Sequence, residues 1–229
     1  SIGKLDDAYV FSSETCGLDV VGAVFVRDVD AGEMVVVDAN GLRSNTWSRG
    51  EREALCVFEF IYFARPDSLV KGRSFHDVRV HLGKFLAVEH PATAEMVIAV
   101  PDSGTPSAIG FAAESGIPFS EGLIKNRYIG RTFIQTTQAL RDIGVKMKLN
   151  PIRDAVRGRK IVLMDDSIVR GTTSRQIVRL LRECGAREIH MRISSPPILY
   201  SCFYGIDTPS RADLIAANLS VEGIRKYVE

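Results

Sequence analysis

Two adjacent carboxylates, Asp165 and Asp166, directly follow an apolar stretch at residues 160–164. Placing such a pair at the end of a buried strand costs free energy unless a partner compensates the charge. A hydrated Mg²⁺ ion is one such partner, since it commonly takes one or two carboxylates together with phosphate oxygens of a substrate. The hydroxyl groups of a sugar are another. The pair therefore indicates a metal-binding or sugar-binding site.

An anion-binding loop is predicted a few residues later, where Gly171, Thr172, Thr173 and Ser174 open a helix. Free backbone N–H groups, hydroxyls and the helix dipole would hold a phosphate there. Carboxylates followed by such a loop suit a ribose 5-phosphate. The alternative is a helix N-cap by Thr172 or Thr173 after a solvated acidic turn, and the preceding apolar strand argues against it. Neither GxxxxGK[ST] nor GxGxxG occurs, which excludes a Walker loop and a Rossmann fingerprint.

A second loop with small residues follows the predicted buried strand at residues 96–100, which Pro101 ends. Asp102, Ser103 and Gly104 come next. Small residues at a strand end allow backbone N–H groups to approach a diphosphate. The residues by themselves fit an ordinary type I turn equally well.

Both loops follow strands of one predicted sheet. Residues 160–164 and 188–194 read as strands, joined by an amphipathic helix over about 172–184. Such strand–helix–strand units form parallel sheets with right-handed crossovers. Ligands bind at the carboxyl ends of parallel strands, so loops 101–106 and 165–174 are expected to face the same crevice.

The first 45 residues have a different pattern. YVFSSE, VVGAVFVRDV and EMVVVDANG are rich in β-branched residues, are separated by glycines and lack a helical period. They predict an antiparallel, all-β segment at 1–45. From about Trp47, strands alternate with amphipathic stretches, which predicts an α/β domain at 46–229.

The composition excludes several classes of protein. The 229 residues include 29 basic and 28 acidic ones, 45% are hydrophobic and 25% are charged, which is typical of a globular chain without a global nucleic-acid-binding charge. No apolar run approaches the roughly 18 residues of a membrane span, and the N-terminus lacks the apolar region of a signal peptide. The four cysteines lie far apart, which favours a reducing, cytoplasmic location; they are Cys16, Cys56, Cys184 and Cys202.

The string DDSIVRGTTS resembles the phosphoribosylpyrophosphate (PRPP) motif of the type I phosphoribosyltransferases. SSETCGLDVVGA, FEFIYFARPDS, VPDSGTPSAIGFA, KNRYIGRTFI and SCFYGID resemble the glutamine PRPP amidotransferases, and the resemblance covers nearly the whole chain. It implies an open, mostly parallel sheet with helices on both faces, preceded by a β-rich remnant of an N-terminal nucleophile glutaminase domain. The implied reaction is displacement of pyrophosphate from PRPP by ammonia, giving 5-phosphoribosylamine, the first committed step of purine synthesis.

The resemblance also implies roles for individual residues. Asp165 and Asp166 become the catalytic pair that engages the ribose hydroxyls and Mg²⁺, with Ser103 as a further Mg²⁺ contact. The pyrophosphate loop is then formed by Asp102, Ser103 and Gly104. The loop around the 5-phosphate is formed by Ser167, Arg170, Gly171, Thr172, Thr173 and Ser174.

Residues 125–150 form a basic segment with six Lys or Arg residues and one acid, Asp142. Charge alone is compatible with a solvated basic face or with a nucleic-acid-binding patch. The resemblance implies instead a flexible loop that closes over PRPP and excludes water, with Lys125, Arg127 and Tyr128 as contacts, and no nucleic-acid partner.

Each cysteine by itself fits a small buried hydrophobe. One branch of the family binds a [4Fe–4S] cluster with four cysteines, and Cys56 and Cys202 match two of those positions. The other two, a C-terminal CxxC, do not occur in the sequence, and two thiolates cannot complete the cluster. The expectation is a cluster-bearing enzyme whose C-terminal tail lies outside these 229 residues.

The chain begins with Ser1 where a complete glutaminase domain would begin with its catalytic cysteine, so the ammonia-dependent half-reaction is expected. PRPP, ammonia or glutamine, and inhibitory purine nucleotides are the expected ligands of a homo-oligomer. Rival functions are a PRPP-binding regulator without turnover, transfer to a nucleobase, and an inert module. The lack of a helix-turn-helix segment argues against a DNA-binding regulator.

Overall fold

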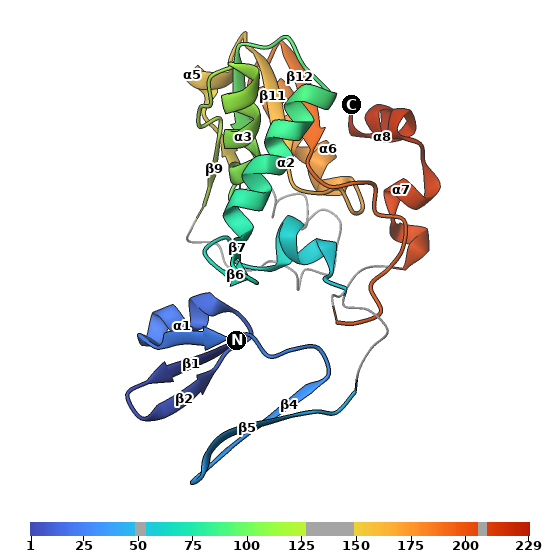
Figure 1. Ribbon diagram of the computed structural model, residues 1–229. Coiled ribbons are helices and arrows are strands. Elements are labelled where there is room, and N and C mark those ends of the chain that lie inside the picture. The colour runs from blue at the N-terminus through green and yellow to red at the C-terminus, as the bar shows by residue number, and fades with distance from the viewer. Residues whose placement is uncertain (49–53, 127–148, 206–209) are drawn as a thin grey trace. The chain divides into compact units, whose positions relative to one another are not determined.

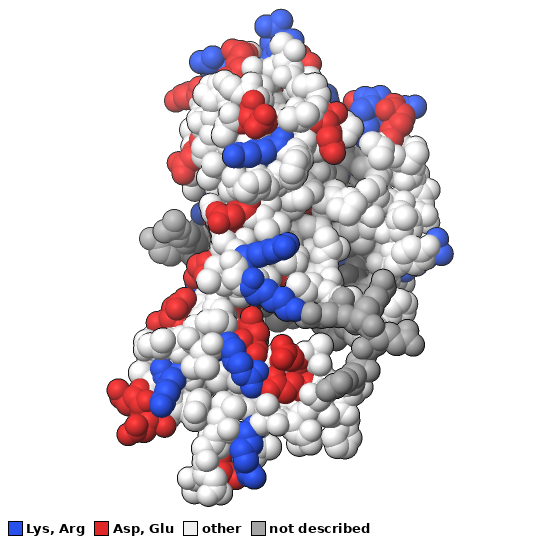
Figure 2. Space-filling model, in the orientation of Figure 1, with Lys and Arg blue, Asp and Glu red and all other residues white. Residues whose placement is uncertain are grey.

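The computed structural model describes residues 1–48, 54–126, 149–205 and 210–229 (Figure 1). The chain divides into two compact units, residues 1–78 and 79–229. The expected boundary at residue 45 rests on a change of sequence pattern and stays a prediction. On the face drawn in Figure 2, basic and acidic side chains are interspersed rather than gathered by sign.

The first unit is built mainly from short antiparallel strands. In the first sheet, β1 (Ile2–Leu5) lies between β2 (Ala8–Phe11) and β3 (Val24–Arg27). A hairpin follows, of β4 (Glu33–Asp38) and β5 (Gly41–Thr46). The remaining elements are a π-helical turn, η1 (Glu59–Phe63), and the two-residue strands β6 (Leu69–Val70) and β7 (Arg73–Ser74).

The prediction of an all-β segment at 1–45 is wrong at α1 (Thr15–Val21). Leu18 is fully buried, and its Cδ2 lies 3.0 Å from the position that a Cβ on Gly3 would occupy. The helix therefore packs directly on β1, and Gly22 ends it with a φ of +75°. Val20 and Val21 belong to the stretch VVGAVFVRDV that predicted a strand, but in the structure they end this helix and the strand β3 begins at Val24. Tertiary packing commonly overrides such weak local preferences.

The second unit contains the predicted parallel sheet. β11 (Lys160–Asp165) lies between β8 (Met96–Ala99) and β12 (Glu188–Ile193), and both pairings are parallel. The three longest described helices are α2 (Phe75–Glu89), which crosses the boundary between the units, α3 (Thr105–Ser115) and α6 (Thr172–Glu183).

Alternate residues of the central strand belong to different cores, so helices cover both faces of the sheet. Ile161 and Leu163 pack with Ile177 of α6 in one core, and Val162 and Met164 pack with Phe111 of α3 in the other (Figure 1). This confirms the predicted open, mostly parallel sheet with helices on both faces.

The described part of the second unit also contains shorter elements. β9 (Leu123–Lys125) and β10 (Leu149–Pro151) form an antiparallel pair, followed by α5 (Arg153–Val156). The C-terminal part contains a 3₁₀ turn, η2 (Arg211–Asp213), then α7 (Ile215–Asn218) and α8 (Val221–Val228). Within the described ranges no helix is both long and apolar enough to cross a membrane.

Candidate active site

The loops after β8 and β11 lie side by side at the carboxyl edge of the sheet, as predicted. Ala99 pairs with Met164, and the N–H of Val100 donates to the carbonyl oxygen of Met164 at 2.8 Å. Gly104 approaches the same strand so closely that a Cβ there would lie 2.6 Å from that oxygen. A glycine is therefore required where the two loops meet.

Asp165 and Asp166 are both buried at this edge, with 8% and 4% of their surface exposed. The backbone N–H of Asp166 donates to Oδ1 of Asp165 at 2.9 Å. Burial and the neighbouring charge of Asp166 raise the pKa of Asp165. Burial also raises the pKa of Asp166, against the lowering effect of hydrogen bonds from the hydroxyls of Ser103 and Ser167.

The hydrogen bond between Ser103 and Asp166 joins the two loops at the carboxylate pair. Carboxylate and hydroxyl oxygens are hard ligands, which suit Mg²⁺. Among the residues that the structure describes, no three His, Cys, Asp or Glu side chains form a group that could hold a metal ion. The pair therefore fits a Mg²⁺ ion that keeps water or substrate oxygens in its remaining positions.

The start of α6 has the form expected of an anion-binding loop. Its N-cap is Gly171, with a φ of +77°, and no side chain caps the helix. The alternative of an N-cap by Thr172 or Thr173 is therefore wrong. Both threonines are exposed, whereas Ser174 is buried. The first N–H groups of this 12-residue helix are left for a ligand or solvent.

Lys125, at the end of β9, is brought to the small-residue loop after β8. Its Nζ lies 2.6 Å from Oδ2 of Asp102, and both side chains are largely exposed. An exposed ion pair of this kind contributes little to stability, so the pair leaves Lys125 available to an anionic ligand. The other two predicted contacts of the basic segment, Arg127 and Tyr128, lie outside the described residues.

Arg79 is a site residue that the sequence analysis missed. It lies on α2 with 4% of its surface exposed, and its charge lowers the pKa of Asp166. A buried arginine is rare unless a carboxylate compensates it. The sequence did contain a signal for its burial, because Phe75, Arg79 and Leu82 have the spacing of one helix face and the other two are apolar.

If the site binds Mg²⁺ and PRPP as the resemblance implies, replacing Arg79 by methionine is expected to weaken that binding about tenfold or more, because Asp166 would lose its compensating charge. The pKa of Asp166 would rise further, so binding would require a higher pH than in the wild type. The measurement is PRPP affinity against pH. Arg73→Met, which removes an exposed arginine, is the control. An unchanged pH midpoint in Arg79→Met would contradict this role.

The two predicted cluster ligands occur in different units, with Cys56 exposed and Cys202 partly exposed. Cys202 Sγ accepts the N–H of Tyr204 at 3.4 Å. In the described part of the chain no third ligand joins either thiol in a metal-binding group. These residues therefore do not fit a [4Fe–4S] cluster by themselves. Cys16 and Cys184 are buried, in agreement with a structural role.

Comparison with known proteins gives consistent matches. The phosphoribosyl transferase domain model matches residues 84–194. The amidophosphoribosyltransferase of Synechocystis is 56% identical over all of this chain and 47% of that protein, and the Bacillus subtilis enzyme is 54% identical over all of this chain and 48% of its own length.

Solved structures agree with the sequence matches. Glutamine PRPP amidotransferase from B. subtilis, solved in complex with ADP and GMP, superposes with a TM-score of 0.92 at 54% identity, covering all of this chain and 50% of that one. A structure described as the allosteric regulatory enzyme of purine biosynthesis gives the same TM-score at 53% identity, covering 49% of that chain. The chain spans about half the length of the relatives it matches. The chain belongs to the amidophosphoribosyltransferase family and contains its phosphoribosyltransferase domain.

Proposed function

We propose that this chain carries out the PRPP half of the amidophosphoribosyltransferase reaction. Ammonia attacks C1 of PRPP, the bond from C1 to the pyrophosphate oxygen breaks, and 5-phosphoribosylamine is formed. The pyrophosphate leaves with the bonding electron pair, and the new amine loses a proton to solvent. The observation that carries the proposal is the buried pair Asp165–Asp166, joined by a hydrogen bond to Ser103 of the neighbouring loop.

The proposed substrate orientation follows the order of the loops. The N–H groups at the start of α6, together with the hydroxyls of Thr172 and Thr173, bind the 5-phosphate. The carboxylates of Asp165 and Asp166 hold the ribose hydroxyls and Mg²⁺. The small residues of the loop after β8 admit the pyrophosphate, and Lys125 adds a positive charge there.

Positioning and electrostatics supply the catalysis in this proposal. A bound Mg²⁺ ion would neutralise charge on the leaving pyrophosphate. Asp165 and Asp166 hold the ribose at the edge of the sheet, and their negative charge stabilises the positive charge that develops on the sugar. Because their pKa values are raised, binding of a cation is what favours their ionised form.

The resemblance and the relatives support further proposals about the full-length protein. Residues 1–45 would be the C-terminal strands of a glutaminase domain that supplies ammonia from glutamine. Purine nucleotides would inhibit, since they share the 5-phosphate and a B. subtilis relative was solved with ADP and GMP. We also propose a cytoplasmic homo-oligomer. No step of the proposed reaction passes through a cluster at Cys56 and Cys202.

The nucleophile distinguishes this function from its rivals. Purified chain is incubated with PRPP and Mg²⁺, and pyrophosphate release is measured with ammonium, glutamine, adenine, guanine or no nucleophile. Release that depends on ammonium supports the proposal. Release that depends on a base indicates a nucleobase transferase. PRPP binding without release under any condition indicates a regulator and contradicts the proposed reaction.

A further inference from the structure

We propose that the C-terminal helices α7 and α8 position the phosphate-binding loop through Ile215 and Tyr227, and thereby set the affinity of the site for a 5-phosphate. These two residues lie more than 40 positions after Gly171 in the sequence, and no role was predicted for them. The inference rests on the proposed function only in placing the 5-phosphate at the start of α6.

Ile215 contacts the loop through both its backbone and its side chain. Its N–H donates to the carbonyl oxygen of Val169 at 2.9 Å. Its Cδ1 lies 2.6 Å from the position that a Cβ on Gly171 would occupy. The residue is buried, with 7% of its surface exposed. The start of α7 thus holds the loop at the two residues that flank Arg170.

Tyr227 of α8 contacts the same glycine and also the first turn of α6. Its Cε1 and Cδ1 lie 3.1 and 3.3 Å from the same Cβ position on Gly171. The guanidinium of Arg175, in the first turn of α6, lies over the ring at 5.2 Å from its centroid. A cation–π contact at this distance is favourable. One aromatic ring therefore fixes both the glycine before the helix and the first helical turn.

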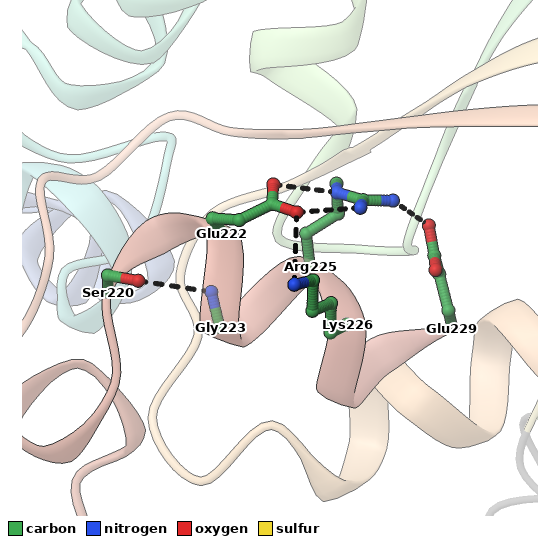
Figure 3. Close-up of polar contacts among 6 residues, drawn as sticks. All are labelled: Ser220, Glu222, Gly223, Arg225, Lys226 and Glu229. Carbon is green, nitrogen blue, oxygen red and sulfur yellow. Dashed lines mark hydrogen bonds and ion pairs between the residues drawn. The ribbon is translucent and has the colours of Figure 1, made fainter.

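The helix that carries Tyr227 is itself stabilised by local interactions, which Figure 3 shows. Ser220 caps α8 by accepting the N–H of Gly223 at 3.2 Å, and Glu222 pairs with Arg225 at 2.7 Å. Arg225 also pairs with Glu229, and Lys226 lies 3.9 Å from Glu222. Pairs at these spacings support a helix before it packs.

The opposite side of α8 packs on the core of the second unit. Ile224, Tyr227 and Val228 contact the cluster that contains Ile177 and Leu181 of α6. Helix α8 therefore packs on α6, the same helix whose N-terminus is proposed to bind the phosphate. Because this core is close-packed, the loss of the Tyr227 ring is expected to displace the loop rather than to be absorbed by neighbouring side chains. Val228 belongs to this core, whereas the three atoms nearest to the Cβ position of Gly171 belong to Ile215 and Tyr227.

The test compares variants of Tyr227, which contacts the loop, with a variant of Val228, which packs in the core. Tyr227→Ala removes the ring, Tyr227→Phe keeps it, and Val228→Ala is a core truncation away from the loop. Ribose 5-phosphate, which lacks the diphosphate, is titrated into each protein by calorimetry, and KM and kcat are measured with PRPP and ammonium. Thermal unfolding of each variant gives its stability.

Tyr227→Ala is expected to weaken ribose 5-phosphate binding about tenfold and to raise the KM for PRPP similarly, with kcat nearly unchanged, because uniform binding is lost. Tyr227→Phe is expected to retain both values. Val228→Ala is expected to lower the melting temperature without changing the affinity. Equal affinity losses in Tyr227→Ala and Val228→Ala, or no loss in either, would overturn the positioning role.

The outcomes also separate this inference from the proposed function. If the wild type binds ribose 5-phosphate and loses affinity in Tyr227→Ala but releases no pyrophosphate with ammonium, the reaction is wrong and the positioning role stands. If the variants bind as the wild type does while ammonium-dependent release is observed, the reaction stands and the positioning role is wrong. A wild type that binds no ribose 5-phosphate overturns the placement of a 5-phosphate at the start of α6 and with it the positioning role, whereas the reaction is judged by ammonium-dependent release alone.

Discussion

Asp165→Asn is expected to lower ammonium-dependent turnover about 100-fold or more, and also to stabilise the ligand-free protein. The first effect follows because the site would lose one of the two charges that we propose hold Mg²⁺, whose contribution to stabilising the leaving group is several kcal/mol. The gain in stability follows from the raised pKa of Asp165, because that pKa shows that a negative charge buried beside Asp166 destabilises the folded protein. Asparagine keeps the Oδ1 that accepts the N–H of Asp166.

The sign of the pH dependence is fixed by that raised pKa. The folded protein binds the Asp165 proton more tightly than the unfolded chain, so stability falls as pH rises from the unfolded pKa of about 3.9 through the folded value. Asp165→Asn has no carboxyl group to ionise at this position, so its stability does not fall in this way. Its advantage in the free energy of unfolding is therefore expected to grow between about pH 5 and about pH 8, reaching on the order of 1–3 kcal/mol.

Thermal unfolding of both proteins across this pH range measures the effect, at roughly 2–4 °C per kcal/mol for a chain of this size. Asp154→Asn, which removes an exposed aspartate in the first turn of α5, is the control and should not stabilise. A variant that is less stable than the wild type at every pH would show that the pair is not a source of strain. A variant with full turnover would disprove the role of Asp165 in the site.

Gly171→Val is expected to abolish measurable PRPP binding. The residue has a φ of +77°, which a β-branched side chain rarely adopts, at a cost of about 1–3 kcal/mol. A Cβ would also lie 2.6 Å from Cδ1 of Ile215 and 3.1 Å from Cε1 of Tyr227, and because both side chains are packed against their surroundings, the start of α6 is expected to shift with them. Such a displacement would misplace the N–H groups that we propose bind the phosphate.

The control for Gly171 separates backbone strain from crowding at the site. Gly158 has a φ of +74° and nothing within 4 Å of its Cβ position. Gly158→Val is therefore expected to lower the melting temperature while PRPP affinity, measured by calorimetry, stays at the wild-type value. If Gly171→Val folds and binds PRPP as tightly as Gly158→Val does, the start of α6 is not the phosphate site.

The sequence was most informative where one local pattern determines the structure. The apolar run at residues 160–164 predicted β11, and the spacing of Ile177, Leu180 and Leu181 predicted α6. Because the carboxyl ends of parallel strands share an edge, the meeting of the two loops followed from the strands alone. The N-terminal strands were predicted from their β-branched residues, and α1 was missed because its packing on β1 through the buried Leu18 is a tertiary contact that no local pattern shows.

Contacts between distant residues could not be predicted in this way. The burial of Arg79 near Asp166 depends on how α2 packs, and the helical pattern shows its position without naming its partner. The contacts of Ile215 and Tyr227 with Gly171 join segments whose separation no periodicity encodes. Tertiary packing determines the burial of Arg79 and the contacts with Gly171. In our proposals these residues change the pKa of Asp166 and the position of the loop, and they do not themselves bind the substrate.

Calorimetric titration of PRPP into the purified chain, with Mg²⁺ and with a chelator, tests the central claim most directly. Measurement in two buffers of different ionisation enthalpy counts the protons released on binding. We expect one site, Mg²⁺-dependent affinity, and a proton release that is smaller in Asp165→Asn than in the wild type, because a metal ion displaces protons from carboxyl groups with raised pKa values and the variant keeps only one of the two. Binding that is independent of Mg²⁺ and releases the same number of protons in both proteins would contradict it.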